Sequence, residues 1–370
     1  MKARAAILWE RNTEWSVEDI DLDDPKDHEV LVKVVASGLC HSDDHAVTGD
    51  LPISIPIIGG HEGAGVVEAV GPGVVGVAPG DHVVMSFIPS CGKCRWCATG
   101  HSNLCDLGAH MLGGTQLDGT ARAHARGTDV GSLAMLGTFA NYTVVPENSV
   151  IKIDSDIPLD RACLVGCGVT TGWGSAVNTG EIEPGDTVVV VGIGGIGGSA
   201  VQGARMAGAR NIVAVDLEPS KEELAKRIGA THFVGSVDEV NTLVGELTLG
   251  VMADVAILTV GVVDGDMLQP MVGLARKAGK VVVTGVAPAT QIDAKVSLFE
   301  VTMWQKQIRG SLFGEANPRS DIPRLLALYK SGQLLLDEMV TREYPLDQIN
   351  DGYADMKSGR NLRGVIIHEH

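Results

Sequence analysis

The stretch from Thr187 to Gly197 reads TVVVVGIGGIG and determines the fold of much of the chain. Residues 187–191 form a continuous run of strand-forming side chains, as expected for a strand buried on both faces of a sheet. Similar runs lie at residues 211–216, 253–258 and 280–285, and helix-like stretches separate them. Buried strands alternating with helices predict βαβ units and a doubly wound parallel sheet, so the fold class is α/β.

The glycines that follow the first strand predict a dinucleotide site. Gly192, Gly194, Gly195 and Gly197 fit the pattern G-x-G-x-x-G, and Asp216 ends the next strand 19 residues after Gly197. Such glycines let a pyrophosphate approach the backbone at a helix N-terminus, and the carboxylate can bind the ribose hydroxyls. A carboxylate there would repel a 2′-phosphate, which favours NAD over NADP. The alternative is a flexible glycine loop in another kind of α/β domain.

The flanking sequence has a different character. Val-rich runs at residues 30–35 and 65–70 are bounded by turn residues, and few helical patterns occur before about residue 160. After residue 312 the pattern becomes mixed again. These changes predict a β-rich domain of residues 1–168 and 312–370, with a nucleotide domain of residues 169–311 inserted into it.

Composition excludes several classes of protein. The 370 residues are enough for two domains, and 45% hydrophobic with 20% charged residues is typical of a globular protein. A net charge of −17 argues against nucleic acid as a partner. The uncharged stretch 187–204 is long enough to cross a membrane, but its six glycines favour a strand and a helix. No secretion signal is visible, so we expect a cytoplasmic protein with no membrane partner.

Four of the seven cysteines lie within one segment of fifteen residues, at Cys91, Cys94, Cys97 and Cys105. Four thiolates at this spacing can enclose one tetrahedral zinc ion in a closed structural site. A pair of redox dithiols and an iron–sulfur cluster are the alternatives. Among the remaining candidates, Cys40, His61 and Cys167 form the ligand set of an open zinc site, although spacing alone does not link them.

Three further motifs carry a resemblance to a known family. GHEGAGVV at residues 60–67, CHSDDH at 40–45 and GCGVTTG at 166–172 resemble zinc-dependent medium-chain alcohol dehydrogenases. The four-cysteine segment and the glycine loop follow in the family's order, so the resemblance covers essentially the whole chain. It implies a GroES-like β-rich catalytic domain with an inserted Rossmann domain. It also implies two Zn²⁺ ions per chain, NAD, a homodimer or homotetramer, and hydride transfer between NAD and a primary or secondary alcohol.

The resemblance assigns the catalytic zinc to Cys40, His61 and Cys167, with water or alcohol in the fourth position. Zinc lowers the pKa of a bound hydroxyl, which makes release of hydride easier. Asp43 should accept the second N–H of His61 and fix its tautomer. Glu62 would lie beside the zinc and exchange transiently with water.

The same resemblance implies a proton path and a set of binding contacts. Ser42 would take the proton first, and His45 would end the relay as a surface histidine beyond the ribose. An N-cap for Ser42 and a solvated surface position for His45 are the alternatives. Cofactor contacts would come from His41, Thr171 and Arg363, and substrate-pocket walls from Phe87, Phe139, Val286 and Leu312.

Other features bear on the subgroup. The long segment 106–138 resembles that of the dimeric long-loop branch, and we expect it to border the substrate entrance. Residues 86–89, 137–139 and 164–168 resemble an actinobacterial subgroup that holds nicotinamide tightly, is assayed with a nitroso acceptor and is linked to a redox carrier. One alternative is a glutathione-dependent formaldehyde (S-hydroxymethylglutathione) dehydrogenase, with Arg122 and Arg126 gripping the conjugate. Another is a non-enzymatic structural member, but such members usually lose the zinc ligands that this chain keeps.

Overall fold

The computed structural model describes all residues from 1 to 370 and separates them into two units. The first unit contains residues 1–167, 317–332 and 340–370. The second contains residues 168–316 and the short segment 333–339. The chain therefore leaves the β-rich unit, forms the second unit and returns, and it crosses between the units again around residues 333–339.

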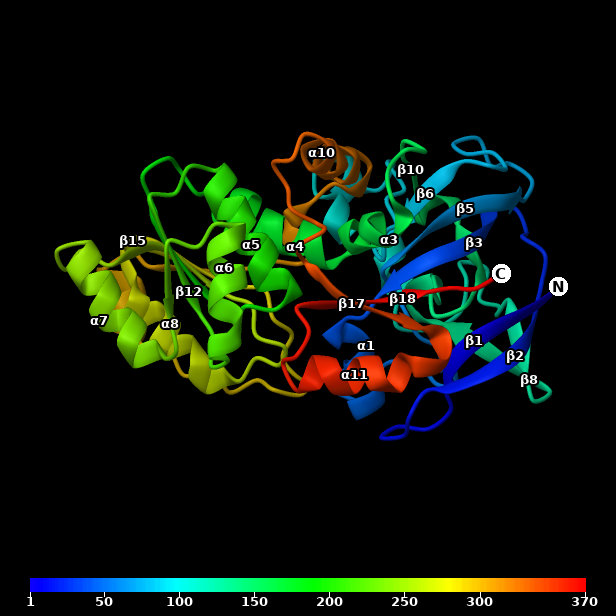
Figure 1. The fold of residues 1–370 in the computed structure, drawn as a ribbon, viewed down its shortest axis with the longest axis horizontal. Helices are drawn as coiled ribbons and strands as arrows, with labels where there is room; N and C mark the ends of the chain where they lie inside the picture. Colours follow the sequence, from blue (N-terminus) through cyan, green and yellow to red (C-terminus); the bar gives the residue numbers. More distant parts are fainter. The chain divides into compact units, whose positions relative to one another are not determined.

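The second unit is built on a six-stranded, entirely parallel sheet (Figure 1). Its strand order is β13 (His232–Val234), β12 (Asn211–Val215), β11 (Thr187–Val191), β14 (Ala253–Leu258), β15 (Ala275–Val283) and β16 (Gln307–Gly310). Its helices are α4 (Gly168–Gly174), α5 (Gly195–Met206), α6 (Glu222–Ile228), α7 (Val237–Leu247), α8 (Leu268–Leu274) and α9 (Leu298–Met303). The prediction of a Rossmann-type parallel sheet is confirmed, while β13 and β16 had no clear sequence pattern.

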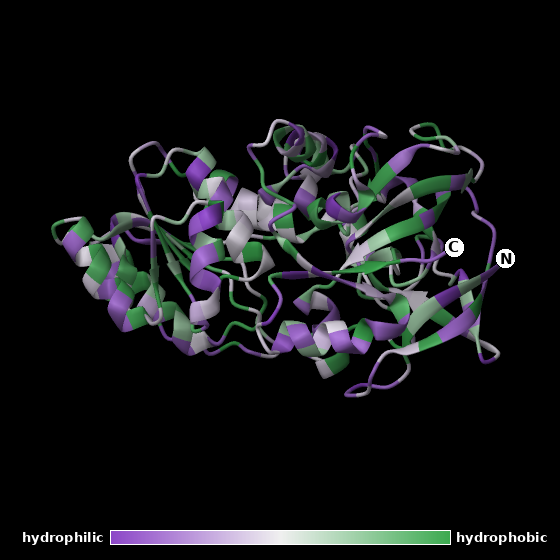
Figure 2. Ribbon diagram, in the orientation of Figure 1, coloured by the Kyte–Doolittle hydropathy of each residue, from purple (hydrophilic) through white to green (hydrophobic).

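Apolar side chains along the central strands form the core of this unit. Val189, Val213 and Leu258 pack with Val240 and Val244 of α7 in one buried cluster. Figure 2 shows hydrophobic residues along the strands, whereas α7 carries both hydrophobic and hydrophilic residues. A strand covered on both faces needs no polar alternation, which explains the run of valines in β11.

The segment 333–339 belongs to the second unit because it is bonded to α5. The side chain of Gln202 accepts from the amide of Leu335 at 2.7 Å and donates to its carbonyl at 3.2 Å. The buried hydroxyl of Ser199 lies 3.7 Å from the sulfur of Met339. Gln202 is fully buried, so these backbone bonds satisfy an amide that would otherwise be costly to bury.

The first unit contains two β structures. A closed barrel has the order β1 (Lys2–Leu8), β2 (Ser16–Leu22), β7 (Ala123–Ala125), β8 (Thr128–Ser132) and β4 (Ile57–Ile58). A seven-stranded sheet contains β10 (Val150–Lys152), β6 (His82–Met85), β5 (Gly63–Val70), β3 (Glu29–Gly38), β18 (Arg363–Ile367), β17 (Val340–Pro345) and β9 (Tyr142–Pro146). Its helices are α1 (His41–Thr48), α2 (Arg95–Ala98), α3 (Leu159–Ala162), α10 (Pro318–Lys330) and α11 (Ile349–Lys357). The C-terminal strand β18 lies antiparallel to β3, so the end of the chain completes the sheet.

The long segment 106–138 helps to close the barrel. It supplies β7, which pairs with β2, and β8, which pairs with β4. The predicted strand runs at residues 30–35 and 65–70 fall within β3 and β5. None of the helices combines the length and the apolar character that crossing a bilayer would require, and the glycine-rich stretch 187–204 forms β11, the loop and part of α5.

The two arginines that favoured a glutathione conjugate are already engaged. Arg122 is almost completely buried and donates from Nε to Glu29 at 2.8 Å and from Nη2 to Asp118 at 2.9 Å. Arg126 pairs with Glu18, and its guanidinium lies 4.3 Å from the centre of the Trp9 ring. The structure therefore gives both side chains a structural role in the barrel.

These contacts predict very different costs for removing the two arginines. Arg122→Ala leaves Glu29 buried without its partner, so unfolding should become easier by about 3–5 kcal/mol. Arg126→Ala removes a more exposed pair and should cost about 1 kcal/mol or less. Thermal and denaturant unfolding of both variants measures the difference. Equal effects of the two substitutions would contradict the assignment of Arg122 as the buried anchor of this segment.

Candidate functional site

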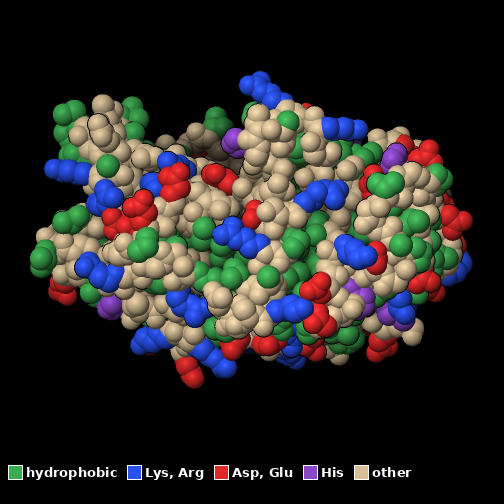
Figure 3. All heavy atoms as spheres, turned by 90° about the horizontal axis from the view of Figure 1, so that it is seen from above, with side chains coloured by type: hydrophobic (Ala, Val, Ile, Leu, Met, Phe, Trp, Pro, Cys, Tyr) green, Lys and Arg blue, Asp and Glu red, His purple; other side chains and the backbone are tan.

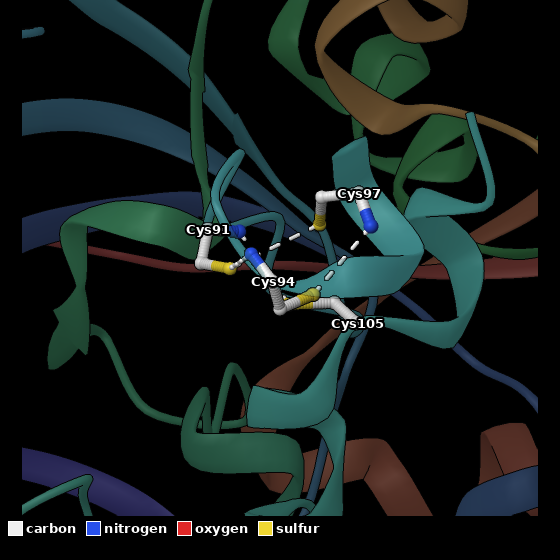
Figure 4. Close-up of side chains that lie close together, drawn as sticks. All are labelled: Cys91, Cys94, Cys97 and Cys105. Atoms are coloured by element: carbon white, nitrogen blue, oxygen red, sulfur yellow. Dashed lines mark hydrogen bonds between the residues drawn. The ribbon is translucent and has the colours of Figure 1, made fainter. Parts of the chain in front are cut away.

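Four cysteine sulfurs gather around one point in the segment that contains α2 (Figure 4). The sulfurs of Cys91, Cys94, Cys97 and Cys105 all lie within 4.8 Å of one another, and the pairs 91/97 and 94/105 are 4.0 Å apart. A disulfide would bring two sulfurs to about 2 Å. Tetrahedral zinc with Zn–S bonds of about 2.3 Å places its sulfurs about 3.8 Å apart. The observed spacing therefore fits a metal centre and not paired disulfides.

Backbone amides donate to sulfurs of this cluster and favour the thiolate form of Cys94. The amide of Cys94 donates to the sulfur of Cys91 at 3.3 Å, and the amide of Cys97 donates to that of Cys94 at 3.5 Å. Amides of Cys97 and Asp106 lower the pKa of Cys94 to about 6. Because four cysteines fill a tetrahedral ion, this centre would have no open position for chemistry.

A second cluster lies buried in the same unit. Cys40 follows β3 and precedes α1, His61 and Glu62 lie between β4 and β5, and Cys167 follows the short helix η5 (Cys163–Gly166). One ligand atom from each of the four residues lies within 4.8 Å of the others, and all four side chains are buried. Fold topology thus brings together three ligands that are separated by 21 and 106 residues in the sequence.

The orientation of His61 fits a metal ligand. Its Nδ1 lies 3.1 Å from Oδ2 of Asp43, while Oδ1 of Asp43 accepts from the amide of Gly60 at 2.7 Å. Its Nε2 is buried and has no hydrogen-bond partner. The neighbouring Cys167 thiol holds the pKa of Cys40 well below its usual range. A carboxylate-held imidazole beside two sulfurs, one of them readily ionised, is the arrangement that binds zinc.

Glu62 and Arg363 form a buried ion pair at the edge of this cluster. Nη2 of Arg363 is bonded to Oε2 of Glu62, which has no exposed surface. Arg363 stands at the start of β18 and is itself almost fully buried. The sequence predicted that Arg363 contacts a pyrophosphate, whereas in the structure its guanidinium forms an ion pair with Glu62. Pairing of β18 with β3 explains this position.

The proposed proton-path residues lie on α1. The hydroxyl of Ser42 is 3.7 Å from the sulfur of Cys40. His45, expected at the surface, is 3% exposed, and its Nδ1 is 2.9 Å from Oδ2 of Asp50. The prediction of a surface histidine is therefore wrong, and the turn after α1 places Asp50 against the imidazole.

The predicted pocket residues differ in their exposure and in their contacts. The ring of Phe87 is half-buried and lies edge-on to His61, with 5.8 Å between ring centres. Phe139 has no exposed surface and packs against Trp15 and Tyr353 in the apolar core, so the structure places it away from an open pocket wall. In the second unit, Val286 is partly exposed and Leu312 is 44% exposed.

The glycine loop has the geometry that a dinucleotide needs. Gly192 has a φ of +93°, a backbone conformation that side chains disfavour, and α5 begins at Gly195. A Cβ on Gly197 would lie 1.9 Å from the carbonyl oxygen of Gly192, so only glycine allows the helix to start this close to the strand. A Cβ on Gly194 would meet nothing within 4 Å, which leaves the N-terminal end of α5 open to a ligand.

Asp216 is held in place beside this loop. Its Oδ2 accepts from the amide of Ile193 at 2.7 Å and from Nζ of Lys221 at 2.9 Å. Lys221 was not predicted from the sequence, since a lysine at the start of a helix has no distinguishing pattern. Two other predicted contacts are polar side chains, of which Thr171 is buried and His41 is half-buried. Thr171 has a buried hydroxyl without a hydrogen-bond partner, and burial lowers the pKa of His41.

Tyr353 is a second residue that the sequence did not indicate. It comes from α11, near the C-terminus, and its hydroxyl donates to the carbonyl of Cys40 at 3.4 Å. Its ring stacks on Trp15. Contacts between residues more than 300 positions apart leave no local pattern, so only the folded chain reveals this support of Cys40.

Comparison with known proteins agrees with this geometry. Residues 26–155 match the alcohol dehydrogenase GroES-like domain, and residues 195–331 match the zinc-binding dehydrogenase family. The chain is 51% identical to an NDMA-dependent alcohol dehydrogenase from Amycolatopsis methanolica, over 100% of this chain and 99% of that protein. It is equally similar to a putative alcohol dehydrogenase D from Mycobacterium tuberculosis, over the full length of both.

Solved structures show the same likeness. A zinc-binding alcohol dehydrogenase domain protein from Burkholderia ambifaria has a TM-score of 0.94 at 35% identity, and benzyl alcohol dehydrogenase from Acinetobacter calcoaceticus has 0.93 at 31%. Both alignments cover 100% of both chains. With a GroES-like unit, a buried zinc ligand set and a nicotinamide-type Rossmann unit, this chain belongs to the zinc-dependent medium-chain alcohol dehydrogenase family.

Proposed function

We propose that this protein interconverts a primary or secondary alcohol and its aldehyde or ketone, with NAD exchanging the hydride and Cys40, His61 and Cys167 holding the catalytic zinc. The buried ligand cluster, in which Nε2 of His61 has no protein partner, carries the proposal. When bound there, zinc would polarise the alcohol hydroxyl and make its proton easier to remove. Cys91, Cys94, Cys97 and Cys105 would hold a second, structural zinc.

The side chains around the cluster would divide the remaining work. Asp43 fixes the imidazole of His61 by its position 3.1 Å from Nδ1. Ser42 lies next to Cys40 and can receive the hydroxyl proton, which His45 on the next turn of α1 would then pass on. Glu62 stays paired with Arg363, so the negative charge of this buried carboxylate is compensated. Phe87, edge-on to His61, offers an apolar surface to the substrate.

The nucleotide would be NAD and would stay bound between turnovers. Asp216 presents a carboxylate beside the glycine loop, where it would accept the ribose hydroxyls and disfavour a 2′-phosphate. Retention of the nucleotide is supported by 51% identity to a relative named as NDMA-dependent. A retained NADH must be reoxidised in place, so we further propose a redox carrier as the electron acceptor.

A second copy of the chain is a further proposed partner. β16 is the last strand in its sheet, so one edge of its backbone is unpaired within a single chain. Exposed apolar side chains precede and occupy this strand, namely Ile292, Leu298, Phe299, Met303 and Ile308. Unpaired edges with exposed apolar residues are typical of association surfaces, and they favour a homodimer as the basic unit of the assembly. On the face shown in Figure 3, Lys and Arg are interspersed with Asp and Glu.

The two zinc sites should respond differently to loss of one cysteine. Cys167→Ala should lower the metal content from two zinc ions to one per chain, abolish turnover and leave the fold intact. Cys97→Ala should destabilise the segment around α2 and lower the yield, because a closed site contributes to folding. Metal analysis with circular dichroism separates the two outcomes. A single zinc equivalent in the fully active, unaltered enzyme would show that one of the ligand sets is misassigned.

Nucleotide choice should depend on Asp216. Denaturing the purified protein should release NAD, identified by chromatography. Asp216→Gly should shift the preference toward NADP, because Lys221 loses its carboxylate partner and becomes available to a 2′-phosphate. Lys221→Met in the Asp216→Gly background is the control and should remove this gain. Release of NADP from the unaltered protein would refute the interpretation of Asp216.

The hydroxyl of Ser42 should matter for proton removal. Ser42→Ala should slow hydride transfer by about 10²–10⁴-fold, the usual contribution of acid–base assistance. Ser42→Thr keeps a hydroxyl and is the matched control, with a much smaller effect. Single-turnover absorbance of bound NADH measures the step in protein whose zinc content is verified. Near-normal hydride transfer in Ser42→Ala would mean that the proton leaves by another route.

A further inference from the structure

The end of α1 places a carboxylate against the buried imidazole of His45. The helix ends at Thr48, and Gly49 adopts a left-handed conformation with φ +84° while its amide donates to the carbonyl of His45 at 3.0 Å. Such a glycine reverses the chain directly after a helix. The reversal brings Asp50 back over the last helical turn, where its Oδ2 lies 2.9 Å from Nδ1 of His45.

A second hydrogen bond fixes the position of this carboxylate. The hydroxyl of Thr48 donates to the same Oδ2 at 2.7 Å. Arg11 donates to the carbonyls of Leu51 and Ile53, which holds the chain just beyond the turn. The hydrogen bonds from Thr48 and then from His45 lower the pKa of Asp50. An ionised carboxylate can only accept, so the ring nitrogen that faces it must carry a hydrogen.

We propose that Asp50 is a positioning residue that holds His45 in the tautomer with hydrogen on Nδ1, which leaves Nε2 as the proton acceptor. The role in catalysis rests on the proposed function, in which His45 passes on the proton. A proton arriving at Nε2 would make an imidazolium whose Nδ1–H already faces a negative charge. The proton on Nδ1 could then pass to the carboxylate of Asp50 that faces it and from there to solvent, because the side chain of Asp50 is 26% exposed whereas that of His45 is 3% exposed.

The pair also explains how a buried histidine can serve a proton path. Burial alone disfavours a charged imidazole and closes the direct route to solvent. The carboxylate of Asp50, in contact with Nδ1, places a negative charge beside the ring. Because this carboxylate is partly exposed, it also connects the buried ring to solvent. Histidines are commonly oriented for proton transfer or metal binding by a carboxylate on the opposite nitrogen.

The test reads the tautomer directly by ¹⁵N NMR of histidine-labelled holoenzyme at a pH where His45 is neutral, with His45→Gln used to assign its resonances. Unaltered protein should show hydrogen on Nδ1. Asp50→Ala removes the acceptor that faces Nδ1, so the Nε2–H tautomer, which a free imidazole prefers, should become populated. Asp44→Asn also removes one negative charge, but Asp44 pairs with Lys357 and not with His45. This control substitution should therefore leave the tautomer unchanged.

Single-turnover hydride transfer is measured on the same variants. Asp50→Ala should slow the step by about tenfold, less than the full range of acid–base assistance because water can replace a terminal group. In a His45→Gln background the same substitution should have no further effect, since the two residues act as one unit. Asp44→Asn should retain the normal rate.

The outcomes separate the inference from the function on which it rests. An unchanged His45 tautomer in Asp50→Ala, or hydrogen on Nε2 in the unaltered protein, overturns the role of Asp50. A changed tautomer with an unchanged rate supports the role of Asp50 in positioning His45 and overturns the proposed proton path through His45. A changed tautomer, together with a slower rate in the wild-type background and no further slowing in the His45→Gln background, supports both the role of Asp50 and the proton path through His45.

Discussion

The ligand cluster of the first unit depends on balancing charge that has been removed from water. Two sulfurs, an imidazole and a carboxylate lie within 4.8 Å of one another, and none is exposed to a significant degree. Negative charge in such a place is costly unless cations lie beside it. Arg363 supplies one of these cations to Glu62, and the donor set of Cys40, His61 and Cys167 fits zinc as the other. The helices and strands around the cluster hold these four side chains in fixed positions.

Each ligand depends on a different part of the chain for its position. Asp43 of α1 holds His61, and Tyr353 of α11 bonds to the backbone of Cys40. Strand β18 brings Arg363 to Glu62 only because it pairs with β3, the strand that leads to Cys40. Residues 340–370 therefore do more than complete a sheet, since Tyr353 and Arg363 support the ligand cluster.

Charged residues in this protein mark structural constraints as often as binding sites. Arg122 and Arg363 both resembled ligand contacts, yet both are nearly fully buried and paired with a glutamate. Asp216 and Lys221, in contrast, form a pair beside a glycine loop whose Gly194 faces open space. Burial on all sides indicates that a pair stabilises the fold, whereas a pair next to an open helix N-terminus remains accessible to a ligand.

The sequence by itself determined the features that depend on local pattern. The valine run of β11, the glycine loop and the four cysteines within fifteen residues each carry their information in neighbouring positions, because strand burial, tight turns and zinc knuckles act over short distances. Tertiary structure alone decided the exposure of His45, the partners of Arg122 and Arg363, the core position of Phe139 and the attachment of residues 333–339 to α5. These depend on which distant segments pack together, and a side chain's burial and partner are set by that packing and not by its own neighbours in the sequence.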